Sequence, residues 1–329
     1  MLPESSHWTR GRRKVTQEAR SVNPIDARRA RFLLISFSRM LKLYALATRA
    51  FLRMTGARRH VLEDGPVSLV YYSVGPAGGE PWVLLHGLGA VAATWAPVMR
   101  ALGRGCRVLV PELSALGGTR APRAGLGVMR GAWTVARLIE KELGGRPVTL
   151  AGISLGGWTA VRLALRRPDL VSRLVLIDAG GYREQDWDKI QQLVRVQDLD
   201  GIDRLYGALF GQVPWLLRVS RKGFLQTYTS PSVTEILDDL EEIDTFHDEE
   251  LARLRVPTAL IWGERDGLFT LEVARAMAAA LPNVHLEVIP GCGHAVHIEC
   301  PDKLIQAIQR FRRATSASAR IEACPAPST

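Results

Sequence analysis

Short runs of apolar residues, most of them closed by glycine, proline or aspartate, recur along this chain and set the strongest limit on its fold. They cover residues 67–74, 82–85, 107–110, 148–151, 174–177, 259–262 and 285–289. A strand that is apolar on both sides is buried on both faces, as in a parallel sheet covered by helices. Segments with a helical pattern separate these strands, for example 129–143, 155–166, 271–281 and 301–313. The alternation predicts an α/β fold with a doubly wound, mostly parallel sheet.

The same pattern divides the chain into parts. The sheet-forming core is expected over residues 61–180 and 255–314. Residues 181–254, between two of the strands, have a helical pattern and no convincing strand. Because a structureless loop of that length is uncommon in a compact domain, we predict a helical cap insertion at one edge of the sheet. Residues 315–329 are small, polar and proline-containing, which predicts a flexible tail.

Positive charge is concentrated ahead of this core. Of the 43 Lys and Arg residues, 14 lie in residues 1–60, together with only three of the 33 acidic residues, so that the rest of the chain is nearly neutral. Residues 1–30 are rich in Arg and poor in large apolar side chains, which predicts disorder. Residues 31–60 are predicted to form an amphipathic helix with cations on one face and apolar side chains on the other.

This basic helix has several interpretations. A membrane span needs about 20 mostly uncharged apolar residues in a row, and the sequence has no such run. Residues 31–54 fit a helix lying on an anionic membrane surface, and equally a helix packed on the core with its basic face in solvent. A start codon assigned too far upstream is a third reading. Nucleic-acid binding is disfavoured, because the core is neutral and the aromatic residues belong to the apolar stripe.

The four cysteines, Cys106, Cys292, Cys300 and Cys324, are too few for a disulfide scaffold, and none has the spacing of a zinc or redox motif. We predict reduced thiols in a reducing compartment, and therefore a cytoplasmic protein, with peripheral attachment to the inner membrane face as an alternative. No metal ion and no organic cofactor are implied.

The residues that point most directly to chemistry lie at Gly152–Gly157, which reads Gly-Ile-Ser-Leu-Gly-Gly. The segment follows an apolar strand and precedes a helical pattern. A serine at a sharp strand-to-helix turn projects out of the sheet, and glycines flank it where side chains would clash. We therefore predict that Ser154 is a nucleophile.

A serine hydroxyl needs a base, which is most often a histidine. His294 follows the last predicted strand in the loop Pro290–Gly293, from which it could reach the serine. His297 is expected at the start of the next helix, in a capping or packing role. His247 and His285 are expected to be structural, and the His86 side chain is expected to shape its own turn.

The base in turn needs a carboxylate that orients its ring. Asp266 lies just beyond an apolar strand in Gly263–Gly267, and the chain order Ser154, Asp266, His294 is the order expected for this arrangement. Asp178 also ends a strand and is the alternative acid. Glu264 is a more remote rival, and Glu299 is expected to cap the last helix.

Acyl transfer also needs two N–H groups that bind the oxyanion of the transition state. The Leu155 N–H, at the start of the helix that follows the serine, is one candidate. The second is expected in the loop His86–Gly89, where two glycines let the backbone approach closely, and we assign it to Leu88.

Taken together, His86–Gly89, Gly152–Gly157, Trp262–Asp266 and Gly291–His294 resemble the α/β-hydrolase superfamily over roughly residues 62–313. The resemblance implies Ser154 as nucleophile, His294 as base, Asp266 as acid, and Leu88 and Leu155 as oxyanion donors. It also implies that the insertion is the helical cap common in this family. The segment Gly117–Arg120, together with an apolar helix ahead of the fold, is similar to membrane-associated monoacylglycerol lipases of this superfamily.

The favoured hypothesis is a serine hydrolase of carboxylic esters that forms an acyl-enzyme. The cap is rich in large apolar residues, which favours an apolar acyl chain. They are Leu205, Tyr206, Leu209, Phe210, Val213, Trp215, Leu216, Leu217, Val219 and Phe224. One alternative is hydrolysis of a C–C bond, or perhydrolysis, by the same three residues. A second is an inactive member that serves as a membrane-associated interaction module.

Overall fold

The computed structural model describes residues 51–123, 126–240 and 245–322. These residues belong to one compact unit, Thr48–Thr329. The predicted disordered segment 1–30 and most of the predicted amphipathic helix lie outside the described residues.

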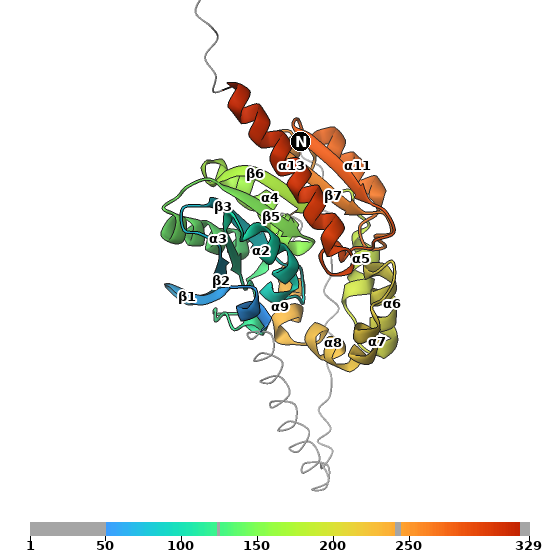
Figure 1. The fold of residues 1–329 in the computed structure, drawn as a ribbon. Helices are drawn as coiled ribbons and strands as arrows, with labels where there is room; N and C mark the ends of the chain where they lie inside the picture. The colour runs from blue at the N-terminus through green and yellow to red at the C-terminus, as the bar shows by residue number, and fades with distance from the viewer. Residues whose placement is uncertain (1–50, 124–125, 241–244, 323–329) are drawn as a thin grey trace, which may run out of the picture. The chain divides into compact units, whose positions relative to one another are not determined.

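One sheet of eight strands organises this unit (Figure 1), in the order β1-β2-β4-β3-β5-β6-β7-β8. The strands are β1 (Arg58–Asp64), β2 (Val67–Val74), β3 (Glu80–Leu85), β4 (Cys106–Pro111), β5 (Val148–Ile153), β6 (Val171–Ile177), β7 (Thr258–Gly263) and β8 (Val284–Ile289). Strands β3 to β8 pair in parallel, whereas β2 pairs antiparallel with both β1 and β4. The prediction of a mostly parallel sheet is confirmed.

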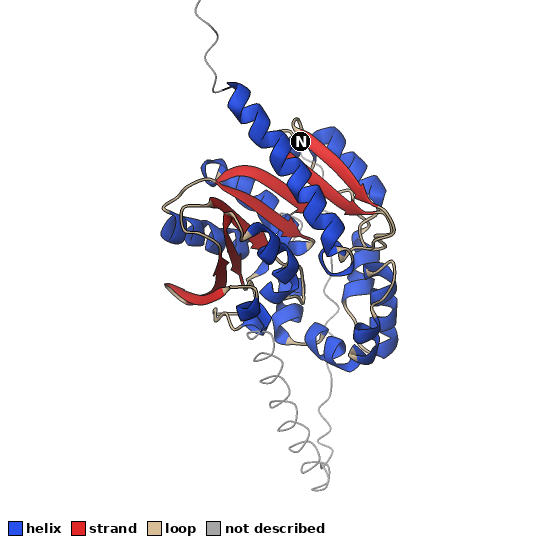
Figure 2. Cartoon of the chain, in the orientation of Figure 1, coloured by secondary structure: helices blue, strands red, loops and turns tan. Residues whose placement is uncertain are grey.

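Helices cover both faces of the sheet (Figure 2). They include α2 (Ala96–Leu102), α3 (Gly127–Leu143), α4 (Leu155–Arg166), α11 (Leu271–Ala280), α12 (Val296–Glu299) and α13 (Pro301–Glu322), with short 3-10 turns η1 (Ala92–Trp95), η2 (Ala115–Gly117) and η3 (Pro168–Leu170). Buried side chains of α3, α4 and α11 join one core cluster, and those of α2, α12 and α13 join the other. Neighbouring residues of β4, such as Val108 and Leu109, alternate between the two clusters because side chains alternate across a strand.

The chain between β6 and β7 is helical, as its sequence pattern indicates. It contains α5 (Trp187–Val194), α6 (Leu199–Leu209), α7 (Trp215–Val219), α8 (Arg221–Tyr228), α9 (Pro231–Asp239) and α10 (Asp248–Leu251). Figure 1 shows α6, α7 and α8 grouped beside the sheet. Leu205, Tyr206 and Phe210 are buried, whereas Trp215 and Val219 expose 74% and 73% of their surface. The last two therefore face solvent and do not enlarge an inner apolar pocket.

Two boundaries differ from expectation. Strand β1 begins at Arg58, inside the segment expected to be helical. Its partner β2 explains this, because Arg58 pairs with Ser73 and the hairpin continues to Asp64. Helix α13 continues to Glu322, into the segment for which a flexible tail is predicted from residue 315. Residues 314–322 contain helix-favouring Ala, Arg and Glu and no Gly or Pro, so nothing local ends the helix earlier.

The prediction of four reduced cysteines is also wrong. Cys292 and Cys300 form a disulfide with their Cα atoms 6.4 Å apart, while Cys106 is a buried free thiol. A turn after β8 and the short helix α12 bring the two residues within bridging distance, which the linear spacing did not reveal. Cys324 lies outside the described residues.

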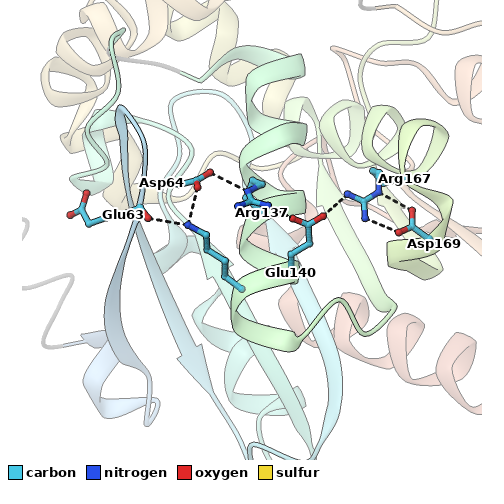
Figure 3. A network of polar contacts seen from close by, with 7 residues as sticks. Glu63, Asp64, Arg137, Glu140, Arg167 and Asp169 are labelled. Atoms are coloured by element: carbon cyan, nitrogen blue, oxygen red, sulfur yellow. Dashed lines mark hydrogen bonds and ion pairs between the residues drawn. The ribbon is translucent and has the colours of Figure 1, made fainter.

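A surface network of ion pairs links the β1–β2 hairpin to the helices (Figure 3). Asp64 pairs with Arg137 and Lys141, Arg137 continues to Glu140, and Glu140 contacts Arg167, which also holds Asp169. Such exposed pairs contribute little individually. Separately, none of the helices found in the described ranges is long and apolar enough to cross a bilayer.

Candidate active site

The candidate residues gather where parallel strands end. Ser154 follows β5, Asp178 follows β6, Asp266 lies in the loop after β7, and His294 lies in the loop after β8. Since β5, β6, β7 and β8 are adjacent and parallel, their carboxyl ends lie along one edge of the sheet. In open α/β sheets this edge is where ligands bind.

Ser154 occupies the strained turn that its flanking residues predict. Its φ is 54°, a left-handed value that is unfavourable for a residue with a side chain. The glycines on both sides are needed for close packing. A Cβ on Gly152 would lie 2.2 Å from the Gly156 oxygen, and one on Gly156 would lie 2.3 Å from the Leu85 oxygen. The strain lifts a partly exposed serine above the sheet edge at the start of α4.

His294 and Asp266 form a hydrogen-bonded pair. His294 Nδ1 lies 2.8 Å from Asp266 Oδ2. The other oxygen, Asp266 Oδ1, accepts hydrogen bonds from the N–H groups of Leu268 and Phe269. These donors hold the carboxylate as an acceptor, so that Nδ1 carries the ring proton and Nε2 is the lone-pair nitrogen. Within the described ranges, Nε2 makes no hydrogen bond and is free to take a proton.

The structure does not join Ser154 to His294 directly. Among the described residues, no hydrogen bond links the Ser154 hydroxyl with the His294 ring. Phe269 contacts His294 and lies near Gly180, which is itself close to Ser154. Its ring meets the His294 ring edge-on with centroids 5.1 Å apart. A Cβ on Gly180 would lie 3.0 Å from the same Phe269 ring and 3.8 Å from the Ser154 carbonyl carbon. Catalytic hydrogen bonds are often long before substrate binds.

The two predicted oxyanion donors belong to segments that meet at Ser154. Leu155 is the first residue of α4, where N–H groups have no partner inside the helix. Leu88 lies in the loop after β3, and a Cβ on its neighbour Gly87 would come 3.2 Å from Ser154 Cβ. In the described chain neither N–H donates a hydrogen bond. The Leu88 carbonyl instead accepts from the Tyr228 hydroxyl of α8, a contact between cap and loop that sequence patterns did not reveal.

His86 has the structural role expected of it. Its Nε2 accepts the Leu113 N–H at 3.0 Å, so that Nδ1 carries the proton and donates to the Gly87 oxygen at 2.9 Å. Burial lowers the pKa of His86 to about 4. Glu112, which follows β4, lies 3.6 Å away and accepts the Ala92 N–H. Burial raises the pKa of Glu112 to about 8, so both members of this pair are neutral at pH 7.

The rival acids are held elsewhere. Asp178 is fully buried, and its Oδ1 accepts the Gly263 N–H at 2.7 Å, at the base of the Asp266 loop. It makes no hydrogen bond with His294 in the part of the chain that the structure describes. Glu264 is exposed and accepts the Gly291 N–H. Of these acids, Asp266 is therefore the one that orients the His294 ring, through Nδ1.

The remaining histidines lie outside this arrangement. His297, in α12, is buried against Trp95 with ring centroids 5.4 Å apart, which agrees with a packing role. Burial lowers the pKa of His297 to about 3. His247 is half-buried and His285 is exposed, and each lies beside acidic side chains.

Glu299 does not have the helix-capping role expected from its sequence position. Its carboxylate accepts three backbone N–H groups, from Gly293 beside His294 and from Gly211 and Gln212 after α6. It thus connects the base loop to the cap. A lone acid before a proline predicts a cap and carries no sign of a contact 87 or 88 residues away.

Asp178, Asp266 and His294 are also the residue types that bind metal ions, with one polar atom of each within 4.8 Å of the others. His294 Nδ1 already contacts Asp266, so the nitrogen that faces the two acids carries a proton and has no lone pair for a cation. The geometry suits proton transfer.

A family comparison agrees with this geometry. The model of the Alpha/beta hydrolase family matches residues 82–307. The chain belongs to this family. The match includes the serine turn, both acids and His294, and it explains the sheet order and the position of the cap.

Three curated relatives of this α/β hydrolase are similar to it over most of their length. The uncharacterized protein Rv2715 of Mycobacterium tuberculosis is 29% identical over 73% of this chain and 77% of its own. The 2-hydroxymuconate semialdehyde hydrolase of Pseudomonas putida is 27% identical over 71% and 87%. Monoacylglycerol lipase ABHD6 of Homo sapiens is 25% identical over 88% and 90%. Relatives of the α/β hydrolase therefore include proteins named as a lipase and as a semialdehyde hydrolase.

A solved structure, that of a membrane phospholipase A described as a bacterial virulence factor, superposes with a TM-score of 0.73. It covers 88% of this chain and 96% of its own at 24% identity, which shows the shared fold.

Proposed function

We propose that this α/β hydrolase cleaves carboxylic esters through an acyl-enzyme on Ser154, with His294 as base and Asp266 as the orienting acid. The observation that carries the proposal is the 2.8 Å contact between His294 Nδ1 and Asp266 Oδ2. This pair lies at the same edge of the sheet as the strained Ser154. The buried pair leaves Nε2 as the proton acceptor.

The reaction then follows from the roles of these groups. His294 Nε2 takes the Ser154 proton as the hydroxyl oxygen attacks the ester carbonyl carbon. The N–H groups of Leu88 and Leu155 stabilise the oxyanion. His294 returns the proton to the leaving alcohol, and the acyl group stays on Ser154. Water, deprotonated by His294, releases the acid in the second half of the cycle.

An apolar acyl chain is the substrate that the cap supports best. Tyr228 of α8 packs over Leu88 and is buried, and the Phe269 ring contacts the His294 ring and lies near Gly180. Aromatic side chains of this kind exclude water and contact hydrocarbon. The relative named as a monoacylglycerol lipase supports the same direction.

Hydrolysis of a C–C bond in a vinylogous diketone is a second candidate, because a relative named as a 2-hydroxymuconate semialdehyde hydrolase matches at 27% identity. The same three residues can serve that reaction. Turnover of a ring-cleavage diketone set beside p-nitrophenyl esters of increasing chain length distinguishes the two: we expect esters to be turned over at least tenfold faster.

The test of the nucleophile is Ser154→Ala. We expect ester kcat/KM to fall by about 10³-fold or more, with Tm little changed, because alanine removes only a hydroxyl that makes no hydrogen bond with the described residues. Wild type should react with a fluorophosphonate probe, and Ser154→Ala should not. Ester turnover that survives in Ser154→Ala rejects the proposal, and an unlabelled wild type favours an inactive interaction module.

We also propose that the basic N-terminal region holds this enzyme at an anionic membrane surface. Residues 1–60 carry a large excess of Lys and Arg, and Met54, Trp215 and Val219 expose apolar surface on the described part of the chain. Lys and Arg near a surface contribute about 1 kcal/mol each to binding anionic lipid. Co-sedimentation with phosphatidylserine vesicles, and not with neutral vesicles, is the expected result, and equal binding to both vesicle types would contradict it.

A further inference from the structure

Asp178 is a buried acid that makes no hydrogen bond with His294 in the described residues, and its conformation is unusual. It is fully buried directly after β6, and its φ is 41°. In the described residues, the other non-glycine residue with positive φ is Ser154. A strained, fully buried carboxyl group persists only where its surroundings use it. Its backbone N–H donates to the Ile261 oxygen and its Oδ1 accepts the Gly263 N–H, so the side chain joins the ends of β6 and β7.

The other oxygen of this carboxyl group explains what it does. Asp178 Oδ2 is enclosed and has no N–H or O–H partner within the described chain. The polar atoms of Asp178, Asp266 and His294 lie within 4.8 Å of one another. The neighbour that faces Asp178 is therefore a second carboxylate, to which an ionised Asp178 could offer only repulsion and a protonated one a hydrogen bond.

Two adjacent buried carboxyl groups cannot both be ionised at low cost, so one of them keeps its proton. Asp266 has three donors to stabilise its charge, from Leu268, Phe269 and His294. The Asp178 side chain accepts a hydrogen bond from a single donor, the backbone N–H of Gly263. Burial first, and the charge of Asp266 second, raise the pKa of Asp178 well above its ordinary value. The proton therefore resides on Asp178.

We propose that Asp178 is a neutral carboxylic acid at pH 7 whose Oδ2–H donates a hydrogen bond to the Asp266 carboxylate, which makes Asp178 a positioning residue for the Asp266–His294 pair. This inference rests on the proposed function. The hydrogen bond fixes the rotation of the Asp266 carboxylate and withdraws part of its charge. The proton stays on Asp178 throughout the cycle, while the serine proton moves only to and from His294.

The neighbouring histidines other than His294 add no charge to the Asp178–Asp266 pair. His297 of α12 lies near His294, and His86, in the loop after β3, lies near His297. Burial lowers the pKa of His86 to about 4 and that of His297 to about 3, so both rings are neutral at pH 7. The acid pair then carries one negative charge.

Two substitutions at this position separate the possible roles. Asp178→Asn has the shape of the neutral acid, since its carbonyl can accept the Gly263 N–H and its amide can donate to Asp266. Asp178→Leu has a similar size and can do neither. For Asp178→Asn we expect kcat/KM within about threefold of wild type and an unmoved acidic limb of the pH profile, because amide and neutral acid have the same charge. For Asp178→Leu we expect kcat/KM to fall at least tenfold.

The direction of the pH shift is the readout that a merely structural role would not move. Without its donor, Asp266 concentrates more negative charge beside His294, so the acidic limb in Asp178→Leu should move to higher pH. If Asp178 were ionised in wild type, Asp178→Asn would remove a negative charge and move the limb to lower pH by about one unit or more. That result, or an unmoved limb in a folded Asp178→Leu protein, overturns the inference.

A measurement without substrate keeps this inference separate from the proposed function. Infrared spectra of the wild-type protein at pH 7 should contain carbonyl bands of protonated carboxyl groups, one of which disappears in Asp178→Asn. Glu112→Gln is the matched control, because Glu112 is the other buried carboxyl group with a raised pKa and its loss should remove a different band. An Asp178 band in a protein that turns over no ester refutes only the proposed function. Ester turnover with no Asp178 band refutes only the inference.

Discussion

The sheet edge carries two buried acid–histidine pairs with opposite properties. In one, His294 and Asp266 are 2.8 Å apart and joined by a hydrogen bond. In the other, His86 and Glu112 are 3.6 Å apart, and each is bonded to backbone groups instead. All four side chains are buried, so burial alone does not distinguish a reactive pair.

What differs is the partner of the second ring nitrogen. The backbone occupies both nitrogens of His86, which leaves no site for a proton. The backbone occupies neither nitrogen of His294: Asp266 takes Nδ1, and Nε2 has no partner in the ranges that the structure describes. Besides His294, two backbone N–H groups donate to Asp266 and stabilise its charge, whereas Glu112 accepts one backbone N–H and keeps its proton. Donor supply therefore decides which carboxyl group is charged.

Exchanging the two histidines for glutamine gives the sharpest test of this contrast. His294→Gln should lower kcat/KM by about 10³-fold or more, because no other group can take the serine proton. His86→Gln should mainly lower Tm, because its ring bridges the Gly87 oxygen and the Leu113 N–H. Ester kinetics and thermal unfolding of both variants measure this. A larger activity loss in His86→Gln than in His294→Gln would reverse the assignment.

Glu112→Gln tests the neutral pair through stability. Glu112 keeps its proton to about pH 8 in the folded state, whereas the unfolded chain releases it near its ordinary pKa of 4.5. Folded protein therefore binds more protons between these values, and stability falls as pH rises from about 4.5 to about 8. Glutamine does not titrate, so the variant should gain roughly 2 to 4 kcal/mol on wild type between pH 5 and pH 8.5.

Thermal unfolding at the two pH values is the measurement. His86 and His297 act in the opposite sense, since their lowered pKa values make stability fall as pH drops below about 6.5. Both proteins share this acid limb, so it cancels in the comparison. Parallel stability curves for wild type and Glu112→Gln would show that Glu112 is already ionised.

Glu299→Gln should have a smaller effect on activity and stability than the histidine substitutions and Glu112→Gln. An amide has one acceptor oxygen in place of two, so at least one of the bonds to Gly293, Gly211 and Gln212 is lost. We expect a loss of about 1 to 2 kcal/mol in unfolding free energy and less than a tenfold loss of kcat/KM. Glu264→Gln is the control, because the carboxylate of this exposed acid, among the described residues, accepts only the Gly291 N–H, in the turn after β8. Equal losses in the two variants would remove any special role for Glu299.

Much of the site could be predicted because its signals are local. Glycines are required around Ser154 because a Cβ at Gly152 or Gly156 would lie only 2.2 or 2.3 Å from a backbone oxygen. These glycines therefore mark the turn in the sequence itself. The position of each acid after a strand also follows from apolar runs. Nothing local distinguished Asp178 from Asp266, since each follows a buried strand, and the choice between them rested on loop order.

The sequence by itself predicted strands β2 to β8, the main helices around them and the edge at which the candidate residues lie, because hydrophobic period and glycine spacing act over a few neighbours. It did not predict the antiparallel strand β1. The tertiary structure decided the contacts: Asp266 on His294, Asp178 on Gly263, Glu299 on the cap, and Cys292 with Cys300. It also decided which buried carboxyl groups keep a proton. Charge state depends on desolvation and on donors from distant segments, and only the assembled fold sets both.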